Sequence, residues 1–213
     1  TMDYNQLNQL YEISKKLYDD KKQEDGANCF NKLKKAVEQQ NITLQWNIIE
    51  KLKELEIAPY LNYLIELLHD RTINPVVKTA IINWMQLEDV NQTIQLEKFD
   101  RYKTINPAQL QVLGKDNFSS KVLNFLDDVE QHNPSLFELI KKLLYRFIYV
   151  NYPFLPSEQD TVPVATVLTI LGNHYLQLEH NELLNSEIDP QKLESYMSQI
   201  IQSEKQYLTI IDD

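Results

Sequence analysis

Glycine is scarce in this chain, and that scarcity limits the folds it can adopt more than any other feature. Only three glycines, Gly26, Gly114 and Gly172, occur among 213 residues, whereas glycine makes up about 7% of an average protein. Tight β-hairpins and phosphate-binding loops depend on glycine, because they need positive φ angles or a close backbone approach to a ligand. The sequence therefore argues against an all-β protein and against a nucleotide-binding α/β protein. It favours helices.

Apolar side chains recur every three or four residues, which places them on one face of a helix. In the first 90 residues this spacing predicts five helices, with apolar faces over Leu7–Tyr18, Phe30–Val37, Leu44–Leu55, Leu61–Leu68 and Val77–Trp84. We expect Asp25-Gly26 to separate the first two helices. Short loops make neighbouring helices antiparallel. The expected fold is all-α, with antiparallel helical hairpins stacked as an α-α superhelix.

Four Asn-Pro or Asp-Pro dipeptides predict helix starts, because the Asn or Asp side chain accepts from a free backbone N–H and proline presets the first helical φ. They are Asn74-Pro75, Asn106-Pro107, Asn133-Pro134 and Asp189-Pro190. In the second half, the apolar spacing predicts one stripe over Phe118–Val129, a buried central helix after Pro134, and further helices with stripes over Val164–Leu178 and Leu193–Leu208. Residues 151–163 contain three prolines and predict a loop.

Residues 91–106 interrupt the helical pattern. Apolar Ile94 and Leu96 alternate with polar Gln95 and Glu97, as in a strand with one buried face. We expect either a small β-hairpin, with strands near 92–97 and 101–105, or an extended connector, since the segment has no Asn-Gly or Asp-Gly turn. This segment would separate an N-terminal helical-repeat lobe, residues 1–90, from a C-terminal helical lobe, residues 107–213.

Residues 60–90, YLNYLIELLHDRTINPVVKTAIINWMQLEDV, resemble a HEAT repeat. The likeness lies in a leucine-rich first helix that is followed by Asp70, Pro75, Val77, Lys78 and Ala80. Two departures are Lys78, where such repeats commonly have arginine, and the bulky Ile81 beside Ala80.

Residues 4–40 look like a degenerate tetratricopeptide repeat, with suitable residues at Leu7, Tyr11, Ala27 and Phe30 but without the terminal proline. As a whole, the chain resembles a family of uncharacterised tetratricopeptide- or HEAT-like proteins from Gram-positive bacteria. The resemblance implies a helical scaffold for macromolecular partners, and it implies no catalytic residue.

The balance of charge predicts which partners the chain can have. Its net charge is −10, whereas a nucleic-acid binder needs positive charge to displace counterions from phosphates. No apolar run is long enough to span a membrane, and the start, TMDYNQLNQLYE, is polar rather than an apolar leader. We therefore expect a cytoplasmic protein with a protein or peptide partner, and neither nucleic acid nor membrane.

The sequence contains no phosphate loop, dinucleotide fingerprint or nucleophile elbow. A single cysteine, Cys29, excludes a multi-cysteine zinc site, and His174 and His180 are six residues apart, which is not one helix face. We expect no catalytic residue, no cofactor and no metal, and hence a non-enzymatic scaffold. The alternative is an enzyme whose site is assembled from distant residues, namely His69, Asp70, His174 and Glu179.

Aromatic residues supply the candidates for partner binding. The set comprises Tyr145, Arg146, Tyr149, Tyr152 and Phe154 in YRFIYVNYPFLP, together with Trp46 and Trp84. Tyrosine, tryptophan and arginine are the usual anchors of protein interfaces. The competing interpretation is that they pack in the core, because each falls on or beside an apolar stripe. Self-association through the segment 145–154 into a homo-oligomer is a third hypothesis.

Overall fold

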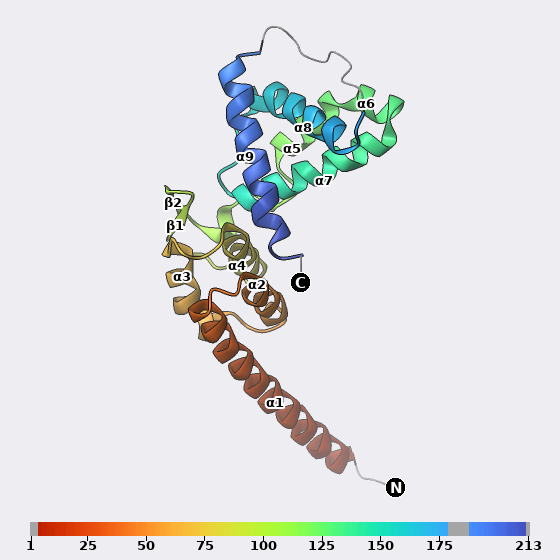
Figure 1. Cartoon of the computed structure of the whole chain (residues 1–213). Coiled ribbons are helices and arrows are strands. Elements are labelled where there is room, and N and C mark those ends of the chain that lie inside the picture. Colours follow the sequence, from red (N-terminus) through yellow and green to blue (C-terminus); the bar gives the residue numbers. More distant parts are fainter. Residues whose placement is uncertain (1–3, 179–187, 212–213) are drawn as a thin grey trace.

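The computed structural model describes residues 4–178 and 188–211, which form helices joined by short loops and one small sheet (Figure 1). The α-helices are α1 (Tyr4–Glu38), α2 (Ile42–Leu52), α3 (Leu61–His69), α4 (Pro75–Leu87), α5 (Asn117–Phe125), α6 (Asp127–His132), α7 (Pro134–Asn151), α8 (Thr161–Tyr175) and α9 (Pro190–Leu208). The strands are β1 (Ile94–Lys98) and β2 (Arg101–Ile105), and the short 3₁₀ helices are η1 (Ala58–Tyr60), η2 (Pro107–Gln109) and η3 (Glu158–Asp160). The predicted all-α helical-repeat fold with a small β-hairpin is confirmed.

The buried apolar side chains form two main cores. The N-terminal core lies among the end of α1, α2, α3, α4 and the hairpin, and it includes Leu33, Ile49, Leu64, Trp84 and Leu96. The C-terminal core lies among α5, α7, α8 and α9, and it includes Val122, Ile140, Phe147, Leu168 and Ile200. A third, smaller cluster of Val76, Tyr149, Val150 and Ile210 connects α4 with α7 and the end of the chain. The boundaries of the two lobes at 1–90 and 107–213 stay a prediction.

Helix α1 corrects the first sequence prediction. Asp25-Gly26 does not break the chain into two helices, so residues 4–40 do not form the expected tetratricopeptide-like hairpin. Gly26 serves close packing instead, because a Cβ atom at this position would lie 2.6 Å from both Leu55 Cδ1 and Tyr60 Oη. The glycine lets the neighbouring segment approach the backbone of a continuous 35-residue helix. The partner of α1 in the helical pair is therefore α2.

Three of the four Asx-Pro dipeptides begin α-helices as predicted. The side-chain oxygens of Asn74, Asn133 and Asp189 accept hydrogen bonds from the backbone N–H groups of Val76, Leu136 and Gln191, at 2.9–3.1 Å. Asn106 does not cap an α-helix; the chain makes only the short η2, and the Asn106 amide donates to Asn91 Oδ1. The oxygen that would cap a helix, Asn106 Oδ1, accepts no hydrogen bond from the described residues, and the helix ends after three residues.

Two boundaries in the C-terminal half also differ from the predictions. The stripe over Phe118–Val129 is divided between α5 and α6, because Leu126 turns into the core while Phe125 is left 50% exposed. Helix α8 begins at Thr161, inside the expected loop, so Pro163 is the third residue of the helix. Proline is tolerated there because the N–H groups of a first turn have no intrahelical partner. Helix α7 is central and largely buried, as expected.

The β-hairpin forms without any of the usual turn dipeptides. Ile94 pairs with Ile105 and Lys98 pairs with Arg101, so Phe99 and Asp100 make a two-residue turn. Their φ angles are 53° and 59°, a left-handed region that bulky side chains rarely adopt. Two contacts hold the turn: the Asp100 N–H donates to Glu97 Oε1 at 2.9 Å, and the Phe99 ring packs against the third cluster. Tertiary contacts therefore stabilise a turn that local sequence disfavours.

Candidate functional site

Four of the seven predicted partner-binding residues lie together where the two cores meet. Trp46 extends from α2, and Tyr145, Arg146 and Tyr149 extend from α7. Tyr207 of α9 joins them: its ring centroid is 6.2 Å from that of Tyr145 and 5.5 Å from that of Tyr149. We call these five residues the aromatic junction. Its members come from three helices that are far apart in the sequence.

Hydrogen bonds and charge hold the aromatic junction in place. The Trp46 indole N–H donates to Tyr149 Oη at 3.1 Å and so connects α2 to α7. The Arg146 guanidinium lies over the Tyr207 ring and forms an ion pair with the Glu204 carboxylate. Tyr149 is only 5% exposed, whereas 47% of Tyr145 remains accessible. A rigid, half-exposed tyrosine next to a fixed arginine is the arrangement expected of an interface anchor.

The tyrosines of the junction stay protonated at neutral pH. Burial is the main cause that raises the pKa of Tyr145, Tyr149 and Tyr207 above the ordinary value of 10.0. For Tyr149, the donated Trp46 N–H only partly opposes this effect. Neutral phenols supply hydrogen-bond donors and aromatic faces for contact with a partner.

The other three predicted residues lie elsewhere. Trp84 is buried in the N-terminal core beside Tyr60, with its indole N–H on the Leu55 carbonyl oxygen at 3.3 Å. Tyr152 is buried too, and its hydroxyl donates to the Gln111 carbonyl oxygen at 2.6 Å. Phe154 is partly buried below the guanidinium of Arg101, 4.7 Å from the ring centroid. These three side chains pack in or against the N-terminal core and are not part of the aromatic junction.

Sequence reasoning missed the charged residues beside this surface. Glu97 and Lys98 are adjacent in β1, and both are buried, although alternation along a strand predicts that only one of two neighbours faces inward. Lys78 of α4 is buried as well, and its Nζ donates to Glu97 Oε2 at 2.7 Å and to the Glu97 carbonyl oxygen at 2.6 Å. The one available signal was Lys78 itself, a lysine inside an apolar helix.

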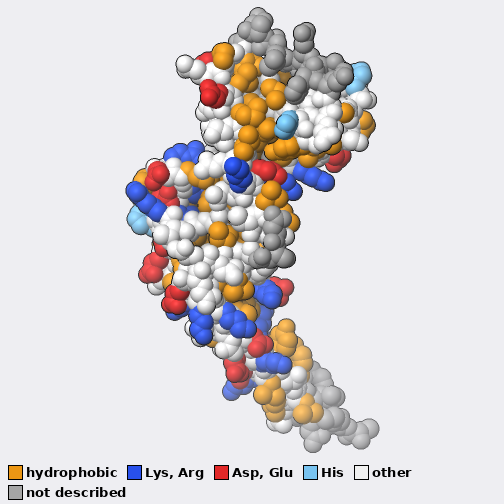
Figure 2. Space-filling view, in the orientation of Figure 1, with side chains coloured by type: hydrophobic (Ala, Val, Ile, Leu, Met, Phe, Trp, Pro, Cys, Tyr) orange, Lys and Arg blue, Asp and Glu red, His pale blue; other side chains and the backbone are white. Residues whose placement is uncertain are grey.

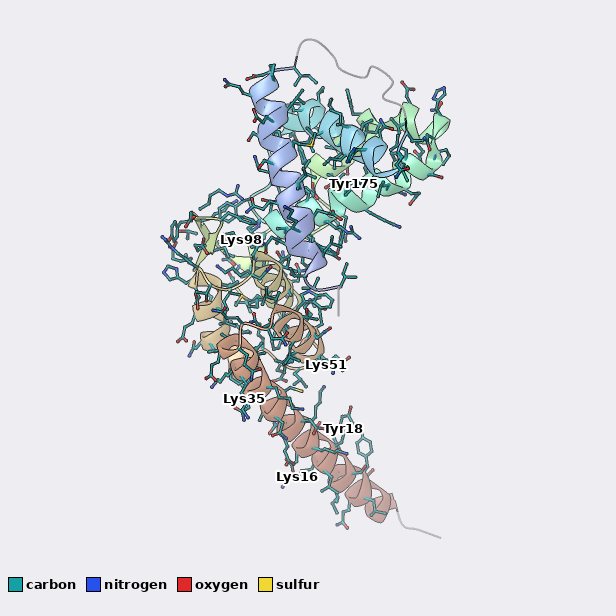
Figure 3. The ribbon with its side chains drawn as sticks, viewed as in Figure 1. Lys16, Tyr18, Lys35, Lys51, Lys98 and Tyr175 are labelled. Carbon is teal, nitrogen blue, oxygen red and sulfur yellow. The ribbon has the colours of Figure 1, made fainter. Side chains whose placement is uncertain are left out.

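Lys98 connects the hairpin to the end of α7 (Figure 3). Its Nζ donates to Thr79 Oγ1 at 2.6 Å and to the carbonyl oxygens of Val150 and Tyr152 at 3.1 and 2.7 Å. Those carbonyls lie at the C-terminus of α7, where the last C=O groups lack intrahelical partners and are free to accept hydrogen bonds from Lys98. Arg101 and Lys103 bond the same segment, through Asn151 Oδ1 and the Pro153 carbonyl oxygen. The basic hairpin therefore fixes α7, and with it Tyr145, relative to the N-terminal core.

The burial of Lys98 predicts a specific dependence of stability on pH. Desolvation, followed by repulsion from Lys78 and Arg101, lowers the pKa of Lys98 well below its ordinary value of 10.5. Between the folded pKa and 10.5 the unfolded chain binds more protons, so the free energy of unfolding should rise with pH. Urea unfolding from about pH 7 to about pH 9.5 should therefore show wild type gaining stability relative to Lys98→Met, by up to about 1 kcal/mol per pH unit. Tyrosine titration is common to both proteins and cancels in the difference. Parallel pH profiles would contradict the depressed pKa.

The residues suspected of catalysis are not brought together. His69 ends α3 and Asp70 follows it, beside the N-terminal core, whereas His174 lies near the end of α8 beside the C-terminal core. Glu179 is outside the described residues. Within residues 4–178 and 188–211, no group of three or more His, Cys, Asp or Glu side chains is placed to hold a metal ion.

The surface of the described residues has an open hollow beside α1 and another beside the hairpin. One, of about 420 Å³, lies between α1 and α2 and is lined by Tyr18, Gly26, Cys29 and Leu55, among others. The other, of about 300 Å³, lies beside the hairpin turn, with Lys78, Lys98 and Gln206 in its lining. His69, Asp70 and His174 line neither hollow.

Comparison with known proteins supports the helical-repeat interpretation. The chain is similar to the TPR repeat-containing protein YsoA of Bacillus subtilis (strain 168), with 29% identity over 142 residues. The matched region covers 65% of this chain but only 42% of YsoA, so the chain spans less than half of that relative. No family model matches the chain, and no solved structure matches it. The predicted resemblance to tetratricopeptide-like proteins of Gram-positive bacteria is thus confirmed.

In the described part of the chain, no helix has both the length and the apolar character needed to cross a membrane.

Proposed function

We propose that this protein is a non-enzymatic helical-repeat scaffold that binds a protein or peptide partner through the aromatic junction. The observation that carries the proposal is that Tyr145 is half exposed beside Arg146. The buried Tyr149, which accepts a hydrogen bond from Trp46, supports this surface. Aromatic and arginine side chains on a rigid support lose little conformational entropy on binding, and so contribute strongly to affinity. The similarity to a TPR repeat-containing protein supports a protein partner in general. A cytoplasmic location is part of the proposal.

The test uses a random-peptide phage library as the probe. Wild type should enrich a class of related peptides, and Tyr145→Ala should bind the enriched peptide about 30-fold more weakly, as expected for a hot spot worth about 2 kcal/mol. Tyr102→Ala is the matched control, because Tyr102 is also about half exposed but lies on β2 beside Arg71. Its affinity should equal that of wild type. No enrichment over an empty surface, or equal binding by Tyr145→Ala, would overturn the proposal.

A further inference from the structure

Helix α1 carries an apolar face with no partner in the described part of the chain. Its N-terminal half projects away from both cores (Figure 1), and every side chain from Asn8 to Asp25 is exposed. Five large apolar side chains lie here with 49–67% of their surface accessible: Leu10, Tyr11, Ile13, Leu17 and Tyr18. Figure 2 shows hydrophobic side chains gathered on this projecting end. A helix that is exposed all round normally depends on a partner or on ion pairs along its surface.

Ion pairs do not supply that support. The salt bridges among the described residues all involve residues after Asp25. Helix α1 contacts the N-terminal core only through its C-terminal part, from Gly26 onward, so the stretch from Asn8 to Asp25 is not held by the core. The apolar face is therefore the remaining means by which this part of α1 could be stabilised.

The spacing of the apolar residues makes the face self-complementary. Leu10-Tyr11 and Leu17-Tyr18 are the same dipeptide repeated seven residues apart, which is the repeat of helices that pair side by side. At 100° per residue, the leucines fall on one side of Ser14 and the tyrosines on the other. A two-fold axis at Ser14 then relates two antiparallel helices so that Leu10 meets Leu17 of the second copy and Tyr11 meets Tyr18. An interface between identical chains requires a surface that is complementary to itself in this way.

Electrostatic repulsion between two copies does not oppose this pairing, although the whole chain is acidic. The segment from Asn8 to Lys22 contains four lysines and three acidic residues, so it is close to neutral, whereas the whole chain has a net charge of −10. Antiparallel pairing also places the two acidic bodies at opposite ends of the paired helices. Lys16 and Tyr18 extend from opposite sides of α1 in Figure 3, so Lys16 lies away from the pairing face.

We propose that α1 binds α1 of a second copy of this chain, as an antiparallel helical pair centred on Ser14. A fully buried aromatic side chain covers about 150–250 Å², so five half-exposed apolar side chains cover on the order of 500 Å² per chain. A standard interface buries about 800 Å² per partner. The dimer is therefore weak and depends on concentration. The proposal does not rest on the aromatic junction, because Tyr145 lies on α7, away from α1.

Analytical ultracentrifugation of the full chain, from low-micromolar to near-millimolar concentration, tests the pairing. Wild type should shift from monomer to dimer, and Leu17→Glu should weaken the dimer at least about tenfold, because it places a carboxylate in the apolar contact. Lys16→Glu, on the opposite face, should leave dimerisation almost unchanged. Unfolding midpoints of all three proteins should agree, since these side chains are exposed. A wild-type protein that stays monomeric throughout, or equal dimerisation by Leu17→Glu, would overturn the proposal.

Cross-linking tests the position of the two-fold axis. In a Cys29→Ala background, which removes the chain's one native thiol, Ser14→Cys should form a disulfide-linked dimer under mild oxidation. Lys16→Cys should not, because its thiols would point away from each other. Leu10→Cys mixed with Leu17→Cys should cross-link to each other faster than either chain does to itself. Equal cross-linking at Ser14 and Lys16 would rule out the proposed interface, and preferential self-linking of Leu10→Cys would rule out the antiparallel direction.

Discussion

Replacing Glu97 with glutamine is expected to lower the free energy of unfolding by about 3–5 kcal/mol, because it leaves the buried Lys78 ammonium without its counter-charge. The Glu97 carboxylate accepts from the Lys78 ammonium at 2.7 Å and from the Asp100 N–H at 2.9 Å. Lys98 is buried close by. Glutamine has nearly the same shape, so packing changes little. The substitution removes one negative charge. It also replaces one of the two carboxylate oxygens by an NH2 group, so the Lys78 ammonium and the Asp100 N–H are left with a single acceptor oxygen. Urea unfolding at neutral pH measures the effect.

Two further variants separate the charge from other causes. Glu158→Gln removes a carboxylate from an exposed pair with Lys121, and exposed pairs contribute only about 0–1 kcal/mol. Combining Glu97→Gln with Lys78→Met removes the stranded cation along with its partner, and should recover much of the lost stability. If Glu97→Gln cost no more than Glu158→Gln, the buried ion pair would have no role in stability.

Ala80→Asp is expected to destabilise the protein by at least about 3 kcal/mol, because it places a carboxylate in an apolar core. Ala80 is fully buried in α4, between Val77 and Ile81, which are also fully buried. An aspartate there must either stay charged without a partner or take up a proton at neutral pH, and both cost free energy. The thermal unfolding midpoint, followed by circular dichroism, should fall by more than about 10 °C.

The matched control for this variant is Ala27→Asp. Ala27 also lies in the interior of an α-helix, but its side chain is exposed. The same substitution there should cost only the difference in helix propensity, about 0.5–0.7 kcal/mol. Similar losses for the two variants would mean that the buried face of α4 has been misassigned.

The sequence predicted the elements of the fold well wherever local chemistry alone decides the structure. Asn74, Asn133 and Asp189 begin helices because a side-chain acceptor and the following proline are all that a helix start requires. The signal failed at Asn106, whose NH2 group donates to Asn91 across the hairpin while its oxygen caps no helix. The predicted helix break at Gly26 failed as well. The sequence does not distinguish a glycine that ends a helix from a glycine that lets a neighbouring segment pack closely against the helix.

The candidate site was predictable only in part. Tyrosine, tryptophan and arginine were recognisable as interface residues by type, but their exposure depends on packing. Trp84 and Tyr152 pack inside the protein and Tyr145 does not, although all three lie on or beside apolar stripes. Tyr207 could not be connected with Tyr145 from the sequence, since the contact depends on how α9 crosses α7.

Helix-forming patterns, helix starts and the all-α class were thus determined by the sequence itself, because they follow from interactions within a few residues. The joint burial of Lys78, Glu97 and Lys98 depends instead on contacts between residues far apart in the sequence. Burying a polar group is unfavourable unless it finds hydrogen-bond partners, and for Lys98 these include the carbonyl oxygens of Val150 and Tyr152. The same holds for the exposed half of α1, whose apolar stripe resembles that of a core helix but packs against no other helix in the described part of the chain. Its apolar face is a local property, whereas its exposure depends on the path that residues 4–178 and 188–211 take.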